Sequence, residues 1–131
     1  MPAGLDGWPD PVVTDARNEV LEAVAALVSA TASGRDRTLV AVDGRSGSGK
    51  STFADELAAR LAGRGVASLR STTDSFHRPR VERLHRGGAS AEGYYLDSHQ
   101  LDVIVDELLV PFARGGAQVR VAAFDEPSDQ P

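Results

Sequence analysis

A glycine-rich stretch, GRSGSGKS at residues 44–51, carries the clearest chemical pattern of the sequence. Gly44, four intervening residues and then Gly49, Lys50 and Ser51 match G-x-x-x-x-G-K-[ST], the pattern of loops that hold phosphate groups. Glycines permit positive φ angles and close backbone approach, so successive N–H groups can curl around a phosphate, and a following helix N-terminus adds partial positive charge. A glycine-rich turn with no ligand is the alternative interpretation.

The polar residues of this loop have distinct expected roles. Lys50, the only lysine of the chain, would neutralise the β and γ phosphates and so support phosphoryl transfer. Ser51 would offer its hydroxyl to Mg²⁺, and Thr52 would donate to the α phosphate. The pattern therefore predicts ATP and Mg²⁺ as cofactors. The predicted phosphate-binding residues are Gly44, Arg45, Ser46, Gly47, Ser48, Gly49, Lys50, Ser51 and Thr52.

Asp74, in the segment TTDSFHRPR, is the second chemical candidate. It directly follows a predicted strand, which places it at the carboxyl edge of a parallel sheet, where ligands bind in open α/β folds. A carboxylate there could accept the proton of an attacking hydroxyl or help to hold Mg²⁺ through water. An N-cap or an Asx-turn is the alternative. The basic run that follows is either a substrate contact or a solvated loop, and comprises His77, Arg78, Arg80, Arg83, His85 and Arg86.

Asp97 and two tyrosines form the third candidate group. Asp97 precedes a predicted helix and has Gln100 three residues later, a variant of the capping-box spacing, so capping alone would explain it. Tyr94 and Tyr95 could stack on a base, but two aromatic residues at the entry to a helix favour packing in the core.

Asp125 and Glu126 end a predicted strand and give a rival interpretation. An apolar strand followed by Asp-Glu is typical of ATPases in which the aspartate holds Mg²⁺ and the glutamate polarises water. On that interpretation the protein would be an ATP-hydrolysing switch.

The elements that would position these residues follow from hydrophobic periodicity. Apolar residues at helical spacing predict amphipathic helices over 14–33, 53–61 and 101–112. Short apolar, β-branched runs predict strands over 38–43, 66–71 and 118–125, and residues 74–96 are expected to be irregular apart from one helical turn. Strand, helix and strand form a βαβ unit. We therefore predict an α/β fold of the P-loop NTPase type, a parallel sheet with flanking helices.

Composition narrows the class of protein. The 131 residues carry a formal net charge of -5 and no cysteine, which rules out a disulfide-stapled domain and thiolate metal sites. The acidic balance argues against nucleic acid and membrane surfaces as partners. The sequence shows no signal peptide and no long apolar run, so we expect a soluble cytoplasmic protein, with a homo-oligomer left open. Residues 1–13 are expected to be a flexible leader and 14–131 the domain.

Three segments in this order resemble the uridine kinase family of P-loop metabolite kinases. VAVDGRSGSGKST resembles its phosphate loop, TTDSFHR its segment after the second strand, and EGYYLDSHQLD its N-[FY]-D-x-P-x-A-[FL]-D region. The resemblance implies a kinase that transfers the γ phosphate of ATP to a small metabolite, with uridine or cytidine favoured. It implies that Asp74 is the general base and that Asp97 binds the ribose hydroxyls, with His77 and Tyr95 as further substrate contacts.

The resemblance covers about residues 38–125 and lacks the family's later elements. Phe124 stands where the family usually has tyrosine, and the arginine-rich lid and two further strands are not in the chain. We therefore expect the N-terminal portion of a kinase domain, with the phosphate loop at 44–52 and the acceptor segment at 74–98. A chain that binds nucleotide without transferring phosphate is the alternative.

Overall fold

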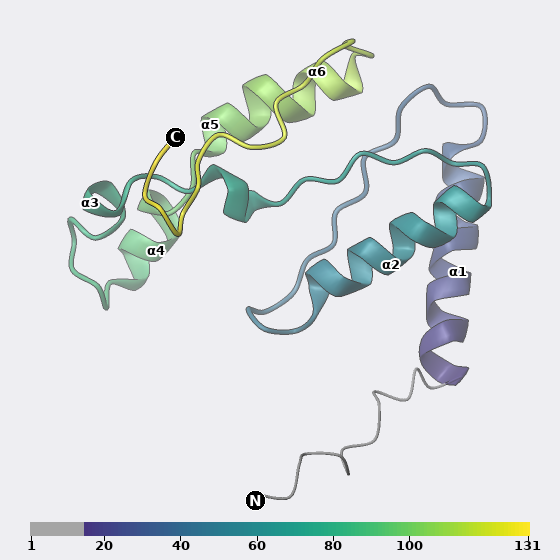
Figure 1. The fold of residues 1–131 in the computed structure, drawn as a ribbon, viewed down its shortest axis with the longest axis horizontal. Helices are drawn as coiled ribbons and strands as arrows, with labels where there is room; N and C mark the ends of the chain where they lie inside the picture. The colour runs from purple at the N-terminus through teal and green to yellow at the C-terminus, as the bar shows by residue number, and fades with distance from the viewer. Residues whose placement is uncertain (1–14) are drawn as a thin grey trace, which may run out of the picture.

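The computed structural model describes residues 15–131, so the predicted leader at 1–13 lies outside the described residues. The described chain forms helices joined by extended and irregular segments (Figure 1). The elements are α1 (Asp15–Ala32), α2 (Lys50–Gly63), the 3-10 turn η1 (Thr73–Phe76), α3 (Arg80–Arg83), α4 (Ala91–Asp97), α5 (Leu101–Val103), the π-helical segment η2 (Ile104–Leu109) and α6 (Val110–Ala113). None of the helices in this part of the chain is long and apolar enough to cross a membrane.

Helices α1 and α2 pack against each other and confirm two of the predicted helices. Their apolar stripes meet in a cluster of Leu21 and Ala25 from α1 with Leu57 and Leu61 from α2, all buried. Each helix ends as the sequence predicts, since Gly34 and Gly65 adopt positive φ angles of 72° and 77° just beyond α1 and α2. Packing of amphipathic faces, rather than intrinsic propensity, supplies most of the stability of such helices.

Polar pairs flank this apolar interface. Arg60 of α2 donates to Glu22 and to Asn18 of α1, the latter at 2.6 Å, and Arg64 donates to Glu22 at 3.1 Å. Hydrogen bonds from Arg60 and then from Arg64 hold the pKa of Glu22 below its ordinary value of 4.5. These pairs join residues about forty positions apart and fix the facing sides of the two helices.

The predicted parallel sheet is wrong, because no segment of residues 15–131 forms a β-strand. The runs 38–43, 66–71 and 118–125 are extended or irregular, and they make no ladder of hydrogen bonds with one another. Leu39 and Leu69, which belong to two of the predicted strands, are 55% and 53% exposed. An apolar run forms a strand only where a neighbouring strand takes its N–H and C=O groups, and the pattern of one run does not supply that neighbour.

Single hydrogen bonds nevertheless connect the run 118–125 to the end of the run 66–71 and to η1. The Ser71 hydroxyl donates to the Val121 carbonyl at 2.8 Å, and the N–H groups of Ala123 and Phe124 donate to the Ser75 carbonyl at 2.8 and 3.1 Å. Residue numbers increase together on both sides, so the two segments run in the same direction. They place buried Phe124 in the same region as η1.

The predicted helix at 101–112 is present, but its middle is a π-helical segment. Pro111 has no N–H to donate to the carbonyl of Glu107, four residues earlier, and its ring crowds that carbonyl. In the structure the Glu107 carbonyl accepts instead from the Arg120 N–H at 2.9 Å, and the Arg120 side chain pairs with the Glu107 carboxylate. The proline thus explains both the wider helical segment and the docking of residue 120 on it.

Candidate functional site

The loop before α2 has the backbone that the glycine pattern predicts. Gly47 and Gly49 adopt φ angles of 74° and 86°, where a side chain would be strained. The first helical hydrogen bond of α2 runs from the Phe53 N–H to the Gly49 carbonyl, and Gly49 provides no side-chain cap. The N–H groups of residues 50–52 therefore precede the helical ladder and lie at the positive end of a 14-residue helix.

Neighbouring side chains shape this loop. The Lys50 ammonium donates to the Arg45 carbonyl at 3.4 Å, a long contact that folds its side chain back over the loop. Asp43 accepts from the Gly44 N–H at 2.7 Å, which removes that donor from the set available to a ligand. A Cβ on Gly44 would lie 2.9 Å from the Ser48 hydroxyl, so the loop packs closely at its first glycine.

The segment after α2 runs back along the helix toward this loop and continues into η1 (Figure 1). Arg70 ties it to the start of α2, since its guanidinium donates to the Asp55 carboxylate at 2.9 Å and to the Ser51 carbonyl at 3.4 Å. Asp74 follows Arg70 by four residues, a span of at most about 14 Å. The connection from the loop helix to Asp74 is therefore short.

Asp74 lies within η1, and Thr72 rather than Asp74 is the capping residue of this turn. The Thr72 hydroxyl accepts from the Asp74 N–H at 3.3 Å and caps the turn. The capping interpretation of Asp74 is therefore wrong, and its side chain is 77% exposed. An exposed carboxylate at the end of this segment is accessible to a ligand.

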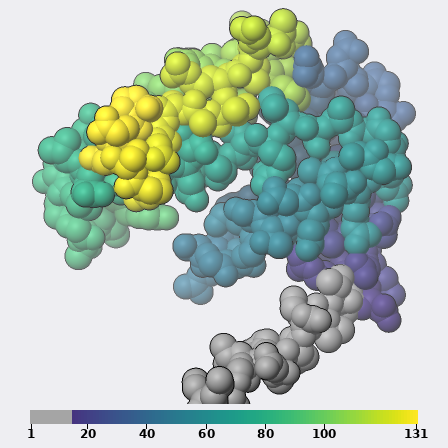
Figure 2. All heavy atoms as spheres, in the orientation of Figure 1, coloured from purple at the N-terminus to yellow at the C-terminus, as the bar shows by residue number. Residues whose placement is uncertain are grey.

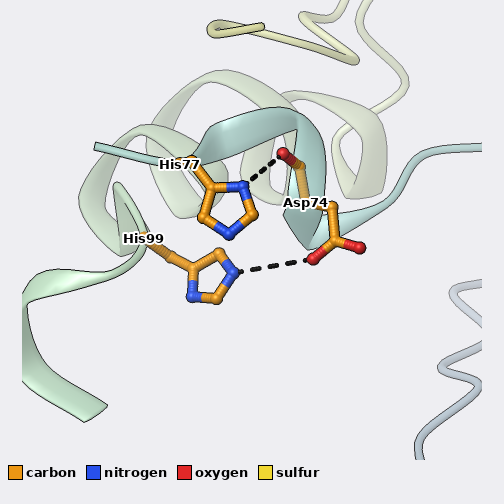
Figure 3. Close-up of side chains that lie close together, drawn as sticks. All are labelled: Asp74, His77 and His99. Atoms are coloured by element: carbon orange, nitrogen blue, oxygen red, sulfur yellow. Dashed lines mark hydrogen bonds and ion pairs between the residues drawn. The ribbon is translucent and has the colours of Figure 1, made fainter. Parts of the chain in front are cut away.

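Two histidines lie against Asp74 (Figure 3). The His77 Nδ1 contacts the Asp74 carbonyl at 2.8 Å, and the His99 Nε2 lies 3.9 Å from the Asp74 Oδ1. The two imidazole rings stack with centroids 4.6 Å apart. Burial, and next the neighbouring His77, lower the pKa of His99, while Asp74 opposes that shift. Burial therefore favours the neutral form of the His99 imidazole.

Main-chain hydrogen bonds between two separate segments create this group. Arg78 donates its N–H to the Ser98 carbonyl at 2.9 Å, and Gln100 donates its N–H to the Phe76 carbonyl at 2.7 Å. His77 and His99 pair between them as an isolated antiparallel bridge. Sequence reasoning missed His99, whose signal was its place two residues after Asp97 in the segment that carries the family resemblance.

Asp97 and the tyrosines differ from the sequence interpretation. Asp97 is the last residue of α4 and does not cap the helix at 101, so the capping interpretation is wrong. Its carboxylate, 14% exposed, accepts from the Arg86 guanidinium at 2.8 Å and lies 3.5 Å from the His85 ring. Tyr94 and Tyr95 are 72% and 79% exposed, so the expected packing in the core is also wrong.

The acidic pair at the end of the chain is held in a local turn. The Asp125 carboxylate accepts from the Ser128 N–H at 3.2 Å, and Asp125 pairs through its main chain with Gln130. Glu126 lies 3.6 Å from the Arg83 guanidinium. Asp125 thus has partners within the C-terminal turn and Glu126 has one in α3, and no contact links either carboxylate to Ser51 among the described residues.

A notch opens between the loop before α2 and the lobe of α3 and α4 (Figure 2). The blue tip in the figure is that loop, and the green-teal lobe facing it carries α3 and α4. A separate depression is lined by Glu107 and residues 118–122, and none of these is a predicted site residue.

No protein-family model matches the chain, and comparison with curated proteins and with solved structures likewise yields no match. The uridine kinase resemblance therefore stays an expectation drawn from the three sequence segments.

Proposed function

We propose that the protein is an ATP-dependent kinase of a small hydroxylated metabolite, with a nucleoside such as uridine or cytidine as the favoured acceptor. One observation carries the proposal: the Walker-type sequence GRSGSGKS coincides with a loop of two left-handed glycines that opens onto the uncapped N-terminus of α2. Local loop geometry and a helix end are the parts of a phosphate site that bind the anion, and they do not require a sheet to be present.

Residues 44–52 would hold the triphosphate. The N–H groups of residues 50–52 precede the first helical hydrogen bond at the positive helix end, and Lys50 needs only to give up its 3.4 Å contact with the Arg45 carbonyl to reach a phosphate. The Ser51 hydroxyl is the residue that would ligate Mg²⁺, which supplies charge neutralisation on the phosphates when bound. Ser51 is exposed and adjacent to Lys50, so the residues present fit this role.

Asp74 would act as the general base. The acceptor hydroxyl oxygen forms a bond to the γ phosphorus, its proton passes to the Asp74 carboxylate, and the bond from phosphorus to the bridging oxygen of ADP breaks. An exposed carboxylate joined to the start of α2 by a four-residue span is consistent with this role. His77 and Tyr95 would contact the acceptor, whereas Asp97 would have to exchange its Arg86 contact for ribose hydroxyls.

ATP binding tests the first part of the proposal. Calorimetry of ATP with Mg²⁺ should give a 1:1 complex that Lys50→Ala weakens about 10- to 100-fold, as expected for a lost charge-assisted hydrogen bond. Arg35→Ala removes one positive charge outside the loop and should leave the affinity unchanged. A wild-type chain that binds no ATP, or a Lys50→Ala chain that binds equally well, would contradict the proposal.

Phosphate transfer to an acceptor tests the second part of the proposal. Coupled ADP release should respond to uridine or cytidine and not to pantothenate or ribulose 5-phosphate. Asp74→Asn should lower turnover about 10²- to 10⁴-fold, the usual contribution of a general base, without changing ATP affinity. Asp102→Asn, another exposed aspartate, is the control. ATP binding without acceptor-dependent ADP release would indicate a nucleotide-binding protein that does not transfer phosphate.

A further inference from the structure

Asp74, His77 and His99 form a group of potential metal ligands, a role separate from the base and acceptor-contact roles proposed above for Asp74 and His77. One ligand atom from each of the three residues can be chosen so that all lie within 4.8 Å of one another. Figure 3 shows both imidazoles beside the Asp74 side chain, with the His99 ring nitrogen directed at the carboxylate. The three side chains come from η1, the residue after it and the segment between α4 and α5.

We propose that these three residues bind one divalent transition-metal ion of the zinc class. This site lies outside the loop at 44–52 and is independent of the Mg²⁺ that would accompany ATP. A carboxylate that ligates zinc does not take up a proton, so zinc at this site would block Asp74 as a base.

His77 is prepared for ligation by its own main chain. A carbonyl oxygen only accepts, so the 2.8 Å contact between the His77 Nδ1 and the Asp74 carbonyl means that Nδ1 carries the proton. The lone pair is then on Nε2. Histidine ligands in metal sites characteristically donate their second ring nitrogen to a carbonyl or carboxylate in this way, which fixes the tautomer and the ring orientation.

His99 supplies an independent indication of a ligand. Its Nε2 is buried and has no hydrogen-bond partner, a costly state for a polar atom. The nearest carboxylate oxygen, at 3.9 Å, is too far for a hydrogen bond. A metal ion between the two atoms would satisfy both.

The distances between the three ligand atoms would suit a zinc ion if the side chains moved slightly closer together. Zinc bonds of about 2.0–2.2 Å place tetrahedral ligand atoms roughly 3.4 Å apart. The group spans up to 4.8 Å and so must contract. Asp74 can provide that movement, because its side chain is 77% exposed and its carboxylate takes no part in capping η1.

Ligand chemistry selects the ion. Two imidazole nitrogens and one carboxylate oxygen suit zinc and its neighbours, whereas Mg²⁺ and Ca²⁺ prefer oxygen ligands alone. Arg83 opposes a cation near His99, but Glu126 lies 3.6 Å from the Arg83 guanidinium and offsets its charge. Three protein ligands leave the fourth position of a tetrahedral ion for water or a ligand.

The test uses untagged full chain with Zn²⁺ by calorimetry and with Co²⁺ as an absorption probe. We expect one ion per chain and tetrahedral Co²⁺ bands. His99→Gln and His77→Gln should each weaken binding by more than about 100-fold, the upper end of what losing an outer-shell partner costs. The chain has three histidines, so His85→Gln is the matched control and should bind as the wild type does.

A second measurement does not depend on how the variants fold. X-ray absorption of the zinc-loaded wild type should show two imidazole ligands at about 2.0–2.1 Å. One imidazole or none, equal weakening by His85→Gln, or displacement of Zn²⁺ by millimolar Mg²⁺ would overturn the proposal. Lys50→Ala should bind Zn²⁺ normally, so a failure of the ATP proposal is distinguishable from a failure of this one.

Discussion

The pair of helices α1 and α2 and the region from η1 to the C-terminus are stabilised in different ways. Leucine and alanine stripes bury each other between α1 and α2. The second region buries Phe76 and Phe124 among short helices and turns that are joined by individual main-chain hydrogen bonds. The candidate metal ligands and the proposed base lie in this second region. Repeated apolar spacing is therefore enough to build the first region, whereas the second depends on particular long-range contacts.

Phe76→Ala should break the second region and have the largest effect. Phe76 is fully buried, and truncation of such a side chain costs about 3–5 kcal/mol of unfolding free energy. Urea unfolding measures the loss, and hydrogen exchange should show it in residues 73–131 while α1 and α2 keep their protection. Equal loss of protection in α1 and α2 would show that the two regions unfold as one. Phe112→Ala, at a half-buried site, should cost less.

Leu21→Ala makes the corresponding change in the first region. Leu21 is 1% exposed within the α1 and α2 interface, and the expected loss is about 2–5 kcal/mol. Leu27→Ala on the same helix is the control, because Leu27 is 67% exposed and its truncation should change stability by less than about 0.5 kcal/mol. Similar losses from both variants would mean that α1 does not bury the face that the structure shows.

Arg86→Ala should show how much burial of an ion pair adds to the stability of the second region. It leaves the Asp97 carboxylate, mostly buried, without its 2.8 Å partner, at an expected cost of about 1–2 kcal/mol. Arg120→Ala breaks a pair of similar length, 2.9 Å, whose carboxylate is exposed, and should cost at most about 1 kcal/mol. Thermal unfolding compares the two. A larger loss from Arg120→Ala would contradict the role assigned to burial.

Glu22→Gln should have the smallest effect and a distinctive pH dependence. The Arg60 and Arg64 hydrogen bonds lower the pKa of Glu22 in the folded state, so this carboxylate stabilises the protein above its ordinary pKa of 4.5, and the stabilisation disappears as pH falls through the lower folded value. The wild-type urea midpoint should therefore drop more steeply than that of Glu22→Gln between about pH 5 and pH 3. Glu19→Gln, which removes another carboxylate of α1, should retain the wild-type steepness.

The sequence predicted the long helices because their periodicity and glycine ends act locally. The same reasoning failed for the strands at 38–43, 66–71 and 118–125. A helix satisfies its N–H and C=O groups within one segment, but a strand needs a partner that its own pattern does not specify. Leu39 and Leu69 show the outcome, since apolar character alone did not bury them.

The candidate site also has one part that local sequence determines and one part that long-range contacts determine. The loop geometry at Gly47 and Gly49 was predictable, because positive φ angles follow from local glycine placement. The group of Asp74, His77 and His99 was not, because it depends on hydrogen bonds that pair residues 76–78 with 98–100. Asp97 illustrates the limit: its spacing indicated a cap, and the fold instead gave it Arg86 as a partner.

By itself, the sequence determined the acidic, cysteine-free composition, the glycine loop with the only lysine of the chain, and the helices that carry their own hydrogen bonds. Tertiary structure decided which apolar runs stay unpaired, which carboxylates are exposed, and that two histidines 22 positions apart meet at Asp74. The physical reason is the distance along the chain over which each interaction acts. Helix ends and glycine turns are set by neighbours within about four residues, whereas strand pairing and side-chain clusters require partners that only the folded chain brings close.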